Sequence, residues 1–274
     1  MSRSICFFAL FAILLPFLAF TRAQPTQVYN HHACSGGIDG FESNSVFATN
    51  LKQVLSTFSS LDQTNNGFYN LSLGQHEDQI SSLALCRGDV GQSSCLECIK
   101  FATTALFQRC PNQMGAIIWY DNCMFRYTNW YMFRSLEGTY ARLSNDTSSS
   151  DTVTYDKQLF TLLEALRDEA SAGNSTLKFA TGDTKFIGAE RIYALVQCIP
   201  DLDQMQCDNC LSRAFDDITK FIPGRAGGRI LGASCSVRFN ATSSIEMFSQ
   251  SSVFVTPKTC YAQLFLFSES YFFY

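Results

Sequence analysis

The sequence predicts an α+β fold with two tandem domains, each a small antiparallel sheet packed on two helices and stapled by disulfides. Three observations support this expectation. A set of cysteines recurs at a constant interval, each copy has two segments of helical periodicity, and the remaining apolar segments are short and rich in β-branched and aromatic residues.

The N-terminal segment is typical of a secretory signal peptide. Arg3 precedes an apolar run over residues 5–20, and Ala23 ends the segment at a suitable cleavage point. The run is shorter than the roughly 20 apolar residues of a spanning helix, and Pro16 interrupts it. We therefore expect residues 1–23 to be cleaved, the mature chain to be secreted, and no later segment to span a membrane.

The charge of the chain argues against nucleic acid as a partner. The formal net charge is −4 and becomes −6 when Arg3 and Arg22 leave with the signal peptide. An acidic chain without a run of Lys or Arg is a poor nucleic-acid binder.

A duplication accounts for most of the mature chain. Four cysteines of the first copy each recur 112 residues later, and other residue types recur with them; the pairs are Cys86/Cys198, Cys95/Cys207, Cys98/Cys210, Cys123/Cys235, Gly115/Gly227 and Arg126/Arg238. Two copies are too few for a solenoid, so the repeat indicates two globular domains.

The domain boundaries follow from composition. Residues 143–152 are polar and Ser/Thr-rich, as expected of an exposed linker. We expect the first domain over residues 24–142, the linker over 143–152, the second domain over 153–250 and a C-terminal tail over 251–274.

Each copy begins with an amphipathic helix and contains a second helix. Helical spacing places the first helices over residues 47–58 and 159–166, and the second over 95–108 and 207–221, just before Pro111 and Pro223. The expected strands cover residues 67–73, 80–87, 114–120, 124–133, 192–199, 229–233 and 236–239.

Eleven of the twelve cysteines remain after Cys6 is removed, and in a secreted chain they are expected to form disulfides. The positions 112 residues after Cys34 and Cys110 hold Asp146 and Ile222, so the second copy lacks both of these cysteines. Joint loss suggests that Cys34 pairs with Cys110. Cys260 is left over, and we consider a free thiol, a disulfide-linked dimer and an imperfect gene model for the tail.

The spacing Cys86-x8-Cys95-x2-Cys98, repeated from Cys198, resembles the signature of the plant cysteine-rich repeat secretory proteins. Their domain is homologous to ginkbilobin, an antifungal seed lectin. The resemblance implies the pairs Cys34–Cys110, Cys86–Cys95 and Cys98–Cys123, and in the second copy Cys198–Cys207 and Cys210–Cys235.

The resemblance also implies a place for a sugar. In ginkbilobin, mannose is held by an Asn after the first cysteine, an Arg six residues before the last and a Glu five residues after it. The first copy has Ser35, Ile117 and Thr128 at these positions. The second copy keeps Arg229 and has Asn240 for the Glu, while its Asn is not placed because the first cysteine is absent.

Arg229 is therefore the one candidate ligand-binding residue of the inherited site. A single Arg cannot reproduce a three-point clamp, and we expect Arg229 to be a surface or sheet-edge charge. Another sugar-binding face could be formed by aromatic rings that stack on a sugar. The candidates are Trp119, Tyr120, Trp130 and Tyr131, of which strand alternation should turn half into the core.

Four triplets predict N-glycosylation, at Asn70, Asn145, Asn174 and Asn240. A glycan on Asn240 would cover the inherited sugar position. We expect the mature chain to be a secreted glycoprotein.

Catalytic and metal chemistry find little support. Each CxxC motif has a further cysteine nine residues upstream, which favours structural pairing over a redox pair, and the two motifs are too far apart for a zinc ribbon. The histidines of the mature chain are His31 and His32, placed before any expected element, and His76. We expect no enzyme activity, no cofactor and no metal.

Together with this resemblance, the sequence leads us to expect a non-enzymatic recognition protein of the plant cell exterior, the apoplast, that binds carbohydrate or an extracellular protein such as a receptor ectodomain. The alternative is an antifungal mannose-binding lectin of the ginkbilobin type.

Overall fold

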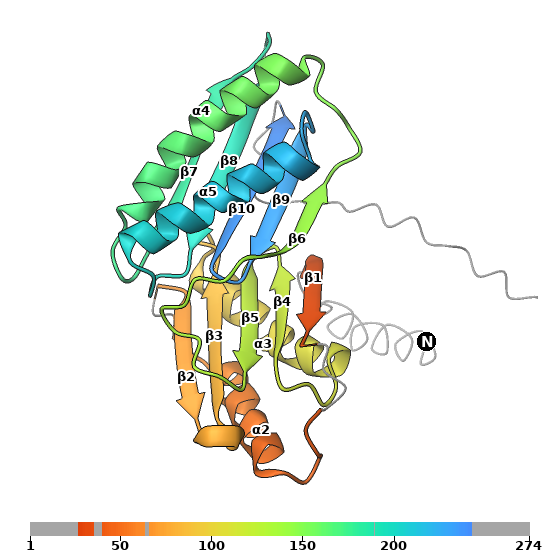
Figure 1. The fold of residues 1–274 in the computed structure, drawn as a ribbon, viewed down its shortest axis with the longest axis vertical. Coiled ribbons are helices and arrows are strands. Elements are labelled where there is room, and N and C mark those ends of the chain that lie inside the picture. The colour runs from red at the N-terminus through yellow and green to blue at the C-terminus, as the bar shows by residue number, and fades with distance from the viewer. Residues whose placement is uncertain (1–26, 36–39, 64–65, 189, 243–274) are drawn as a thin grey trace, which may run out of the picture.

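The structure is a computed structural model that describes residues 27–35, 40–63, 66–188 and 190–242. These residues form two domains, each with a five-stranded antiparallel sheet and two long helices, so the expected α+β fold is confirmed (Figure 1). The expected signal peptide, the tail at 251–274 and Cys260 lie outside the described residues.

The first domain has the strand order β1-β4-β5-β3-β2. Its elements are β1 (Tyr29–Cys34), α2 (Val46–Ser59), β2 (Phe68–Leu73), the 3₁₀ helix η1 (His76–Asp78), β3 (Ile80–Cys86), α3 (Gln92–Arg109), β4 (Ala116–Tyr120) and β5 (Cys123–Thr128). The apolar faces of α2 and α3 cover one face of the sheet, with Leu51, Val54 and Ile99 fully buried.

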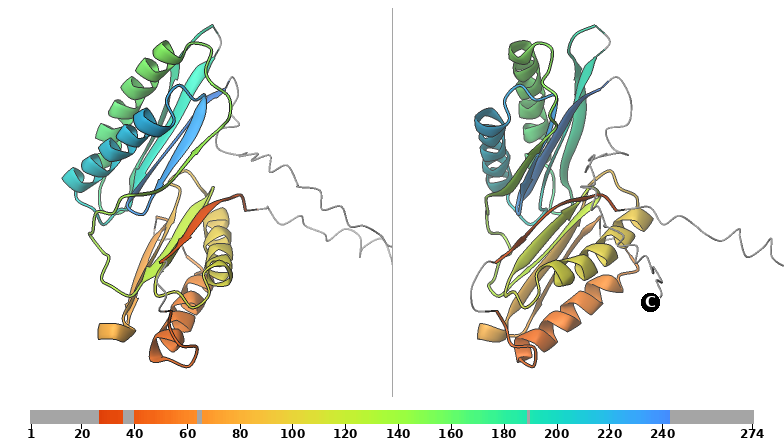
Figure 2. Two further views of the ribbon diagram at one scale, coloured as in Figure 1. Left: turned by 45° about the vertical axis from the view of Figure 1, so that its right-hand side comes forward. Right: turned by 90° about the vertical axis from the view of Figure 1, so that its right-hand side faces the viewer.

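The second domain repeats this arrangement in the order β6-β9-β10-β8-β7. Its elements are β6 (Thr139–Ser144), α4 (Thr152–Ser171), β7 (Lys178–Lys185), β8 (Arg191–Cys198), α5 (Gln204–Phe221), β9 (Gly227–Gly232) and β10 (Cys235–Thr242). Figure 2 shows α4 and α5 on one side of the molecule and α2 and α3 on the opposite side. No helix within the described ranges is long and apolar enough to cross a membrane.

Side chains at three helix N-termini accept hydrogen bonds from backbone N–H groups that have no partner within the helix. Ser45 accepts one from Ala48 N at the start of α2, and Asp151 accepts one from Thr154 N at the start of α4. Asp203 and Gln206 form a reciprocal capping box on α5. These caps explain why the helices begin before the apolar residues that predicted them.

The expected boundary near residues 143–152 is wrong, because β6 pairs with β9 and begins the second sheet at Thr139. The expected correspondence of Cys34 with Asp146 is wrong as well. Cys34 lies opposite Ala116, whereas Ser144 lies opposite Gly228, the repeat partner of Ala116. Ser144 is therefore the counterpart of Cys34, and the second copy has two extra residues between this strand and the helix that follows.

Five disulfides lie within the described residues and have the same pairings as the resemblance implies. Cys34–Cys110 links β1 to the end of α3, across a sequence separation of 76. In each domain, one of the remaining bonds links the third strand to the start of the following helix, and the other links that helix to the last strand.

The two domains share an apolar core. The face of the first sheet that α2 and α3 leave open carries Leu85, Ile117 and Trp119, which belong to one buried cluster with the core of the second domain. Residues 129–138, which we name the connector, cross in front of this face, and Met132 is fully buried (Figure 1). Gln197 Nε2 also donates to the carbonyl of Cys86 at 2.9 Å across the junction. The domains therefore pack as one unit.

Candidate functional site

The inherited sugar position of the first domain carries no charge. Ser35 exchanges hydrogen bonds with the backbone of Gly115, and its hydroxyl lies 3.2 Å from Gln113 Oε1. Ile117 and Thr128 are buried, and Ile117 belongs to the core between the domains. Ser35 and Thr128 both lie near Gly115, but the three positions offer no charged group that could clamp a sugar.

The second domain places an asparagine where the sequence analysis found none. Asn145 follows Ser144, the counterpart of Cys34, and bonds the backbone of Gly227 as Ser35 bonds that of Gly115. Asn240 lies opposite Gly227 in β10. A β-carbon built on Gly227 would lie 2.7 Å from Asn240 Oδ1 and 3.0 Å from Asn145 Nδ2, so the two carboxamides converge over this glycine.

Arg229 is not the surface or sheet-edge charge that we expected. It lies on β9, an inner strand, and its guanidinium donates to Asp121 Oδ1 at 2.6 Å and to Asn30 Oδ1. Both partners belong to the first domain, and the Arg229 and Asp121 side chains are 15% and 10% exposed. Arg229 therefore ties the domains together and is not free to clamp a sugar.

Arg238 extends this junction. Its guanidinium lies 3.7 Å from Asp121 Oδ2 and directly opposite Arg229 in the neighbouring strand. Burial, and next the nearby charge of Arg229, lower the pKa of Arg238 to about 10. Asp121 thus offsets two arginines of the second sheet at once.

The aromatic candidates divide cleanly by exposure. Trp119 and Tyr120 are buried, whereas Trp130 is 43% and Tyr131 62% exposed at the start of the connector. Tyr140, on β6, is also 43% exposed, and the sequence analysis did not single it out. Exposed rings of this kind are available to stack on a ligand.

Trp130 and Tyr140 flank a charged pair, and together these four residues form what we name the connector patch: Trp130, Tyr140, Arg126 and Glu137. Arg126 donates to Glu137 Oε1 at 2.6 Å, and the Tyr140 hydroxyl donates to Glu137 Oε2 at 3.2 Å. The Arg126 guanidinium lies 5.9 Å from the centre of the Trp130 ring. The patch therefore combines two exposed rings with a carboxylate and a guanidinium.

Contacts with buried residues of both domains hold the patch in place. The ring of Tyr140 lies 5.4 Å from that of buried Trp119, whose indole N–H donates to the carbonyl of Gly232 at 3.3 Å. Ser234 Oγ accepts from Glu137 N at 2.8 Å and donates to the carbonyl of Ser135. Residues of both domains thus fix the connector, which preorganises the patch for a ligand.

The electrostatics of the patch follow from its partial burial. Desolvation raises the pKa of the Tyr140 phenol, and the negative charge of Glu137 raises it further. Tyr140 therefore stays a neutral donor. Trp130 was named from the sequence as a candidate ring, and Arg126 had a signal through its repeat partner Arg238, while Glu137 and Tyr140 fell outside the expected strands.

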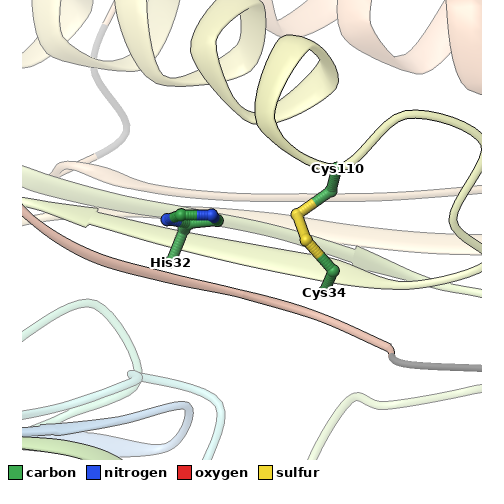
Figure 3. A group of neighbouring side chains, drawn as sticks. All are labelled: His32, Cys34 and Cys110. Atoms are coloured by element: carbon green, nitrogen blue, oxygen red, sulfur yellow. A yellow bond between two sulfur atoms is a disulfide. The ribbon is translucent and has the colours of Figure 1, made fainter.

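Within the part of the chain that the structure describes, one group of residues has the composition of a metal site. His32, Cys34 and Cys110 place their ligand atoms within 4.8 Å of one another (Figure 3). The two cysteines are joined to each other, so neither offers the thiolate that a metal needs. The disulfide accounts for the cluster.

His31 and His32 were expected before any secondary structure, but they lie on β1. The ring of His31 stacks on Trp119, and the Tyr29 hydroxyl bonds to His32 Nδ1. Desolvation lowers the pKa of both histidines, and the charge of Arg109 lowers that of His32 further. Their contacts hold the edge strand in place.

The four glycosylation asparagines lie at separate points of the surface, except that Asn145 and Asn240 are neighbours. Asn70 is exposed on edge strand β2, and Asn174 is exposed in the turn between α4 and β7. Asn240 is half-buried on inner strand β10.

These features define a class: a tandem, disulfide-stapled α+β protein whose two copies pack against each other through a shared apolar cluster. The family described as "Salt stress response/antifungal" matches residues 20–130 and 142–242. The chain therefore belongs to the cysteine-rich repeat secretory protein family, with two such domains, also termed DUF26.

Relatives from Arabidopsis thaliana agree with this assignment. Cysteine-rich repeat secretory protein 38 is 34% identical over 242 residues, covering 86% of this chain and 95% of that protein. Cysteine-rich receptor-like protein kinase 26 is 35% identical over 239 residues, covering 84% of this chain. The match spans only 35% of that kinase.

Solved structures show the same fold. The tandem DUF26 ectodomain of the Arabidopsis cysteine-rich receptor-like protein PDLP8 superposes with a TM-score of 0.64 at 19% identity, covering 78% of this chain and 98% of that one. The corresponding ectodomain of PDLP5 gives a TM-score of 0.62 at 23% identity, covering 77% of this chain and 98% of that one.

Proposed function

We propose that this chain is a secreted, non-enzymatic recognition protein of the apoplast that binds carbohydrate through the connector patch. The observation that carries the proposal is the pair of exposed rings, Trp130 and Tyr140, around the Arg126–Glu137 pair. Sugar rings stack on aromatic faces, while their hydroxyl groups need fixed donors and acceptors. Trp130 and Tyr140 supply the aromatic faces. The Tyr140 hydroxyl and the partly exposed Glu137 carboxylate, which buried Arg126 holds in place, are the polar groups beside them.

The inherited mannose position is a weaker candidate. Asn145 follows β6, and Arg229 and Asn240 lie on the neighbouring strands β9 and β10, but Arg229 is held by Asp121, and Asn240 stands where the resemblance implies a carboxylate. Competing for this arginine would break the junction between the domains. The antifungal mannose-binding lectin therefore remains the alternative to be tested.

A protein partner is a second candidate function. Trp, Tyr and Arg are the residues that dominate protein–protein binding energies, and the patch contains all three. The structural neighbours support this reading, because the matching chains of PDLP8 and PDLP5 are ectodomains of receptor-like proteins.

A glycan array probed with the glycosylated protein tests the proposal. We expect binding to a defined set of glycans, strong loss of that binding in Trp130→Ala, and retention in Phe101→Ala, which removes an exposed ring from α3. Tyr140→Phe keeps the ring and removes only the bond to Glu137, so it should weaken binding partially.

Other outcomes assign the function elsewhere. Mannoside binding that survives Trp130→Ala and is lost in Asn145→Ala would support the lectin alternative. Absence of any glycan binding, together with Trp130-dependent binding to a receptor ectodomain, would replace the carbohydrate proposal with the protein partner.

A further inference from the structure

A crevice lies between the two domains, away from the connector patch. Its volume is about 300 Å³, and its walls include Asn66, Arg87 and Val90 from the first domain and Asn174, Thr176 and Leu177 from the second. This volume falls at the lower end of the roughly 300–1,000 Å³ of small-molecule sites, so the crevice suits a small, compact group.

The domains meet closely beside the crevice. A β-carbon on Gly88, in the crevice wall, would lie 2.4 Å from the ring of Phe179 on β7. The carbonyl of Cys86, another wall residue, accepts the bond from Gln197. Any group that fills the crevice would therefore contact both sides of a tightly packed junction.

A glycosylation triplet forms the second-domain wall. Asn174 and Thr176 are the first and third residues of Asn174-Ser175-Thr176, and both line the crevice. Asn174 Oδ1 accepts hydrogen bonds from Thr176 N at 2.9 Å, from Thr176 Oγ1 at 2.6 Å and from Leu177 N at 3.0 Å. These bonds fix the carboxamide at the crevice and use its oxygen, so that Nδ2 is the atom left for a glycan.

The wall chemistry suits the first sugar of an N-linked glycan. Leu177 is 39% exposed, which leaves an apolar surface that the acetamide methyl group and the apolar face of N-acetylglucosamine can cover. Val90 offers a second apolar contact, and the carboxamide of Asn66 can bond a sugar hydroxyl.

We propose that Asn174 carries an N-linked glycan whose first sugars occupy this crevice and bridge the two domains. Asn174 Nδ2 forms a bond to C1 of N-acetylglucosamine and loses one proton. The bond from C1 to the diphosphate of the lipid-linked donor breaks, and the diphosphate leaves. The glycan is then a structural part of the domain junction and not only a surface modification.

The first test compares glycan release at two asparagines in folded protein from a eukaryotic secretory host. Mass spectrometry of glycopeptides should find Asn174 occupied, and a peptide N-glycosidase should release its glycan several-fold more slowly than that of Asn70, which stands on an exposed edge strand. Leu177→Ala removes a crevice contact without touching the triplet and should speed release at Asn174 only.

The second test measures thermal unfolding. Asn174→Gln also removes the local hydrogen bonds, so its effect is compared in glycosylated protein and in protein made without glycosylation. We expect Asn174→Gln to lower the midpoint temperature of unfolding more in the glycosylated protein than in the protein made without glycosylation. An unoccupied Asn174, equal release at Asn174 and Asn70, or equal falls in midpoint would overturn the proposal.

Discussion

At the scale of single residues, the Arg229–Asp121 pair decides how the second sheet relates to the first domain. The carboxylate lies between β4 and β5 of one domain, and the guanidinium comes from an inner strand of the other. Both side chains are largely buried. Removing either one would therefore leave a largely buried charge without its main partner. Arg229, which the resemblance placed at a sugar position, thus serves here as a structural tie.

We expect Arg229→Ala to lower the free energy of unfolding by about 2 kcal/mol. This is less than the roughly 3–5 kcal/mol of a fully buried pair, since both groups keep some exposure and Arg238 stays near Asp121. Urea denaturation measures it. Arg191→Ala, which breaks the more exposed pair with Asp183, is the control and should cost under about 1 kcal/mol. Equal losses in the two variants would contradict the assigned role.

The second residue-scale prediction concerns Asn145 and Asn240. Their carboxamides converge over Gly227, so a glycan on one would occupy the space of the other. We expect no secreted, folded molecule to carry glycans on both, and Asn145→Gln to raise the occupancy of Asn240. Intact glycoprotein mass spectrometry reports both. A major species with glycans on both asparagines would contradict the close approach of the two carboxamides.

At the scale of elements, β1 depends on one covalent bond. It is an edge strand paired only with β4, and Cys34–Cys110 ties its end to α3. The long loop that this bond closes, of separation 76, is worth about 4 kcal/mol in the chain-entropy model.

We expect the double variant Cys34→Ala/Cys110→Ala to reduce the free energy of unfolding by up to that amount. We expect β1 to be the first strand to detach from the sheet. Hydrogen exchange should become fast in residues 29–34 while β3 and β5 stay protected. The matched variant Cys198→Ala/Cys207→Ala opens a loop of separation 9, worth about 3 kcal/mol, and should leave β1 unchanged. Uniform acceleration over the whole sheet in the first variant would contradict this local role.

The elements that could be predicted from sequence were those with a strong pattern. Both helices of each copy and the inner strands carry continuous apolar or periodic residues, and they were found. The strands β1, β6 and β7 were missed, and all three are sheet edges with polar sequences, such as Lys178–Lys185. An edge strand pairs on one side only, so its residues need not follow the apolar alternation that marks a strand.

At the candidate site, the residues that were missed lie outside the strongly patterned elements. Trp130 was named from the sequence, but Glu137 and Tyr140 lie where the chain passes from one sheet to the next, a path that local patterns do not specify. Asn145 was named only as a glycosylation site. Its place beside Gly227, equivalent to that of Ser35 beside Gly115, was missed because the constant interval of 112 breaks by two residues between β6 and α4. Only the register of β6 against β9 shows the correct correspondence.

At the scale of the whole molecule, the shared core predicts cooperative unfolding. Leu85, Ile117 and Trp119 of the first sheet are buried against the second domain, so unfolding of either domain would expose this shared apolar face to water. We expect one calorimetric transition for the two domains, with agreement between the calorimetric and van't Hoff enthalpies. Two resolved transitions in the intact chain would mean that the contacts between the domains contribute little to the free energy of unfolding.

The central claim is that ligand recognition occurs at the connector patch, where both domains hold one rigid segment. Hydrogen–deuterium exchange with and without a glycan selected on the array tests it most directly. The account predicts protection by the ligand in peptides that cover residues 126–140, absent in Trp130→Ala. Protection confined to peptides around residues 143–149 and 225–242 would place recognition at the inherited sugar position and contradict the account.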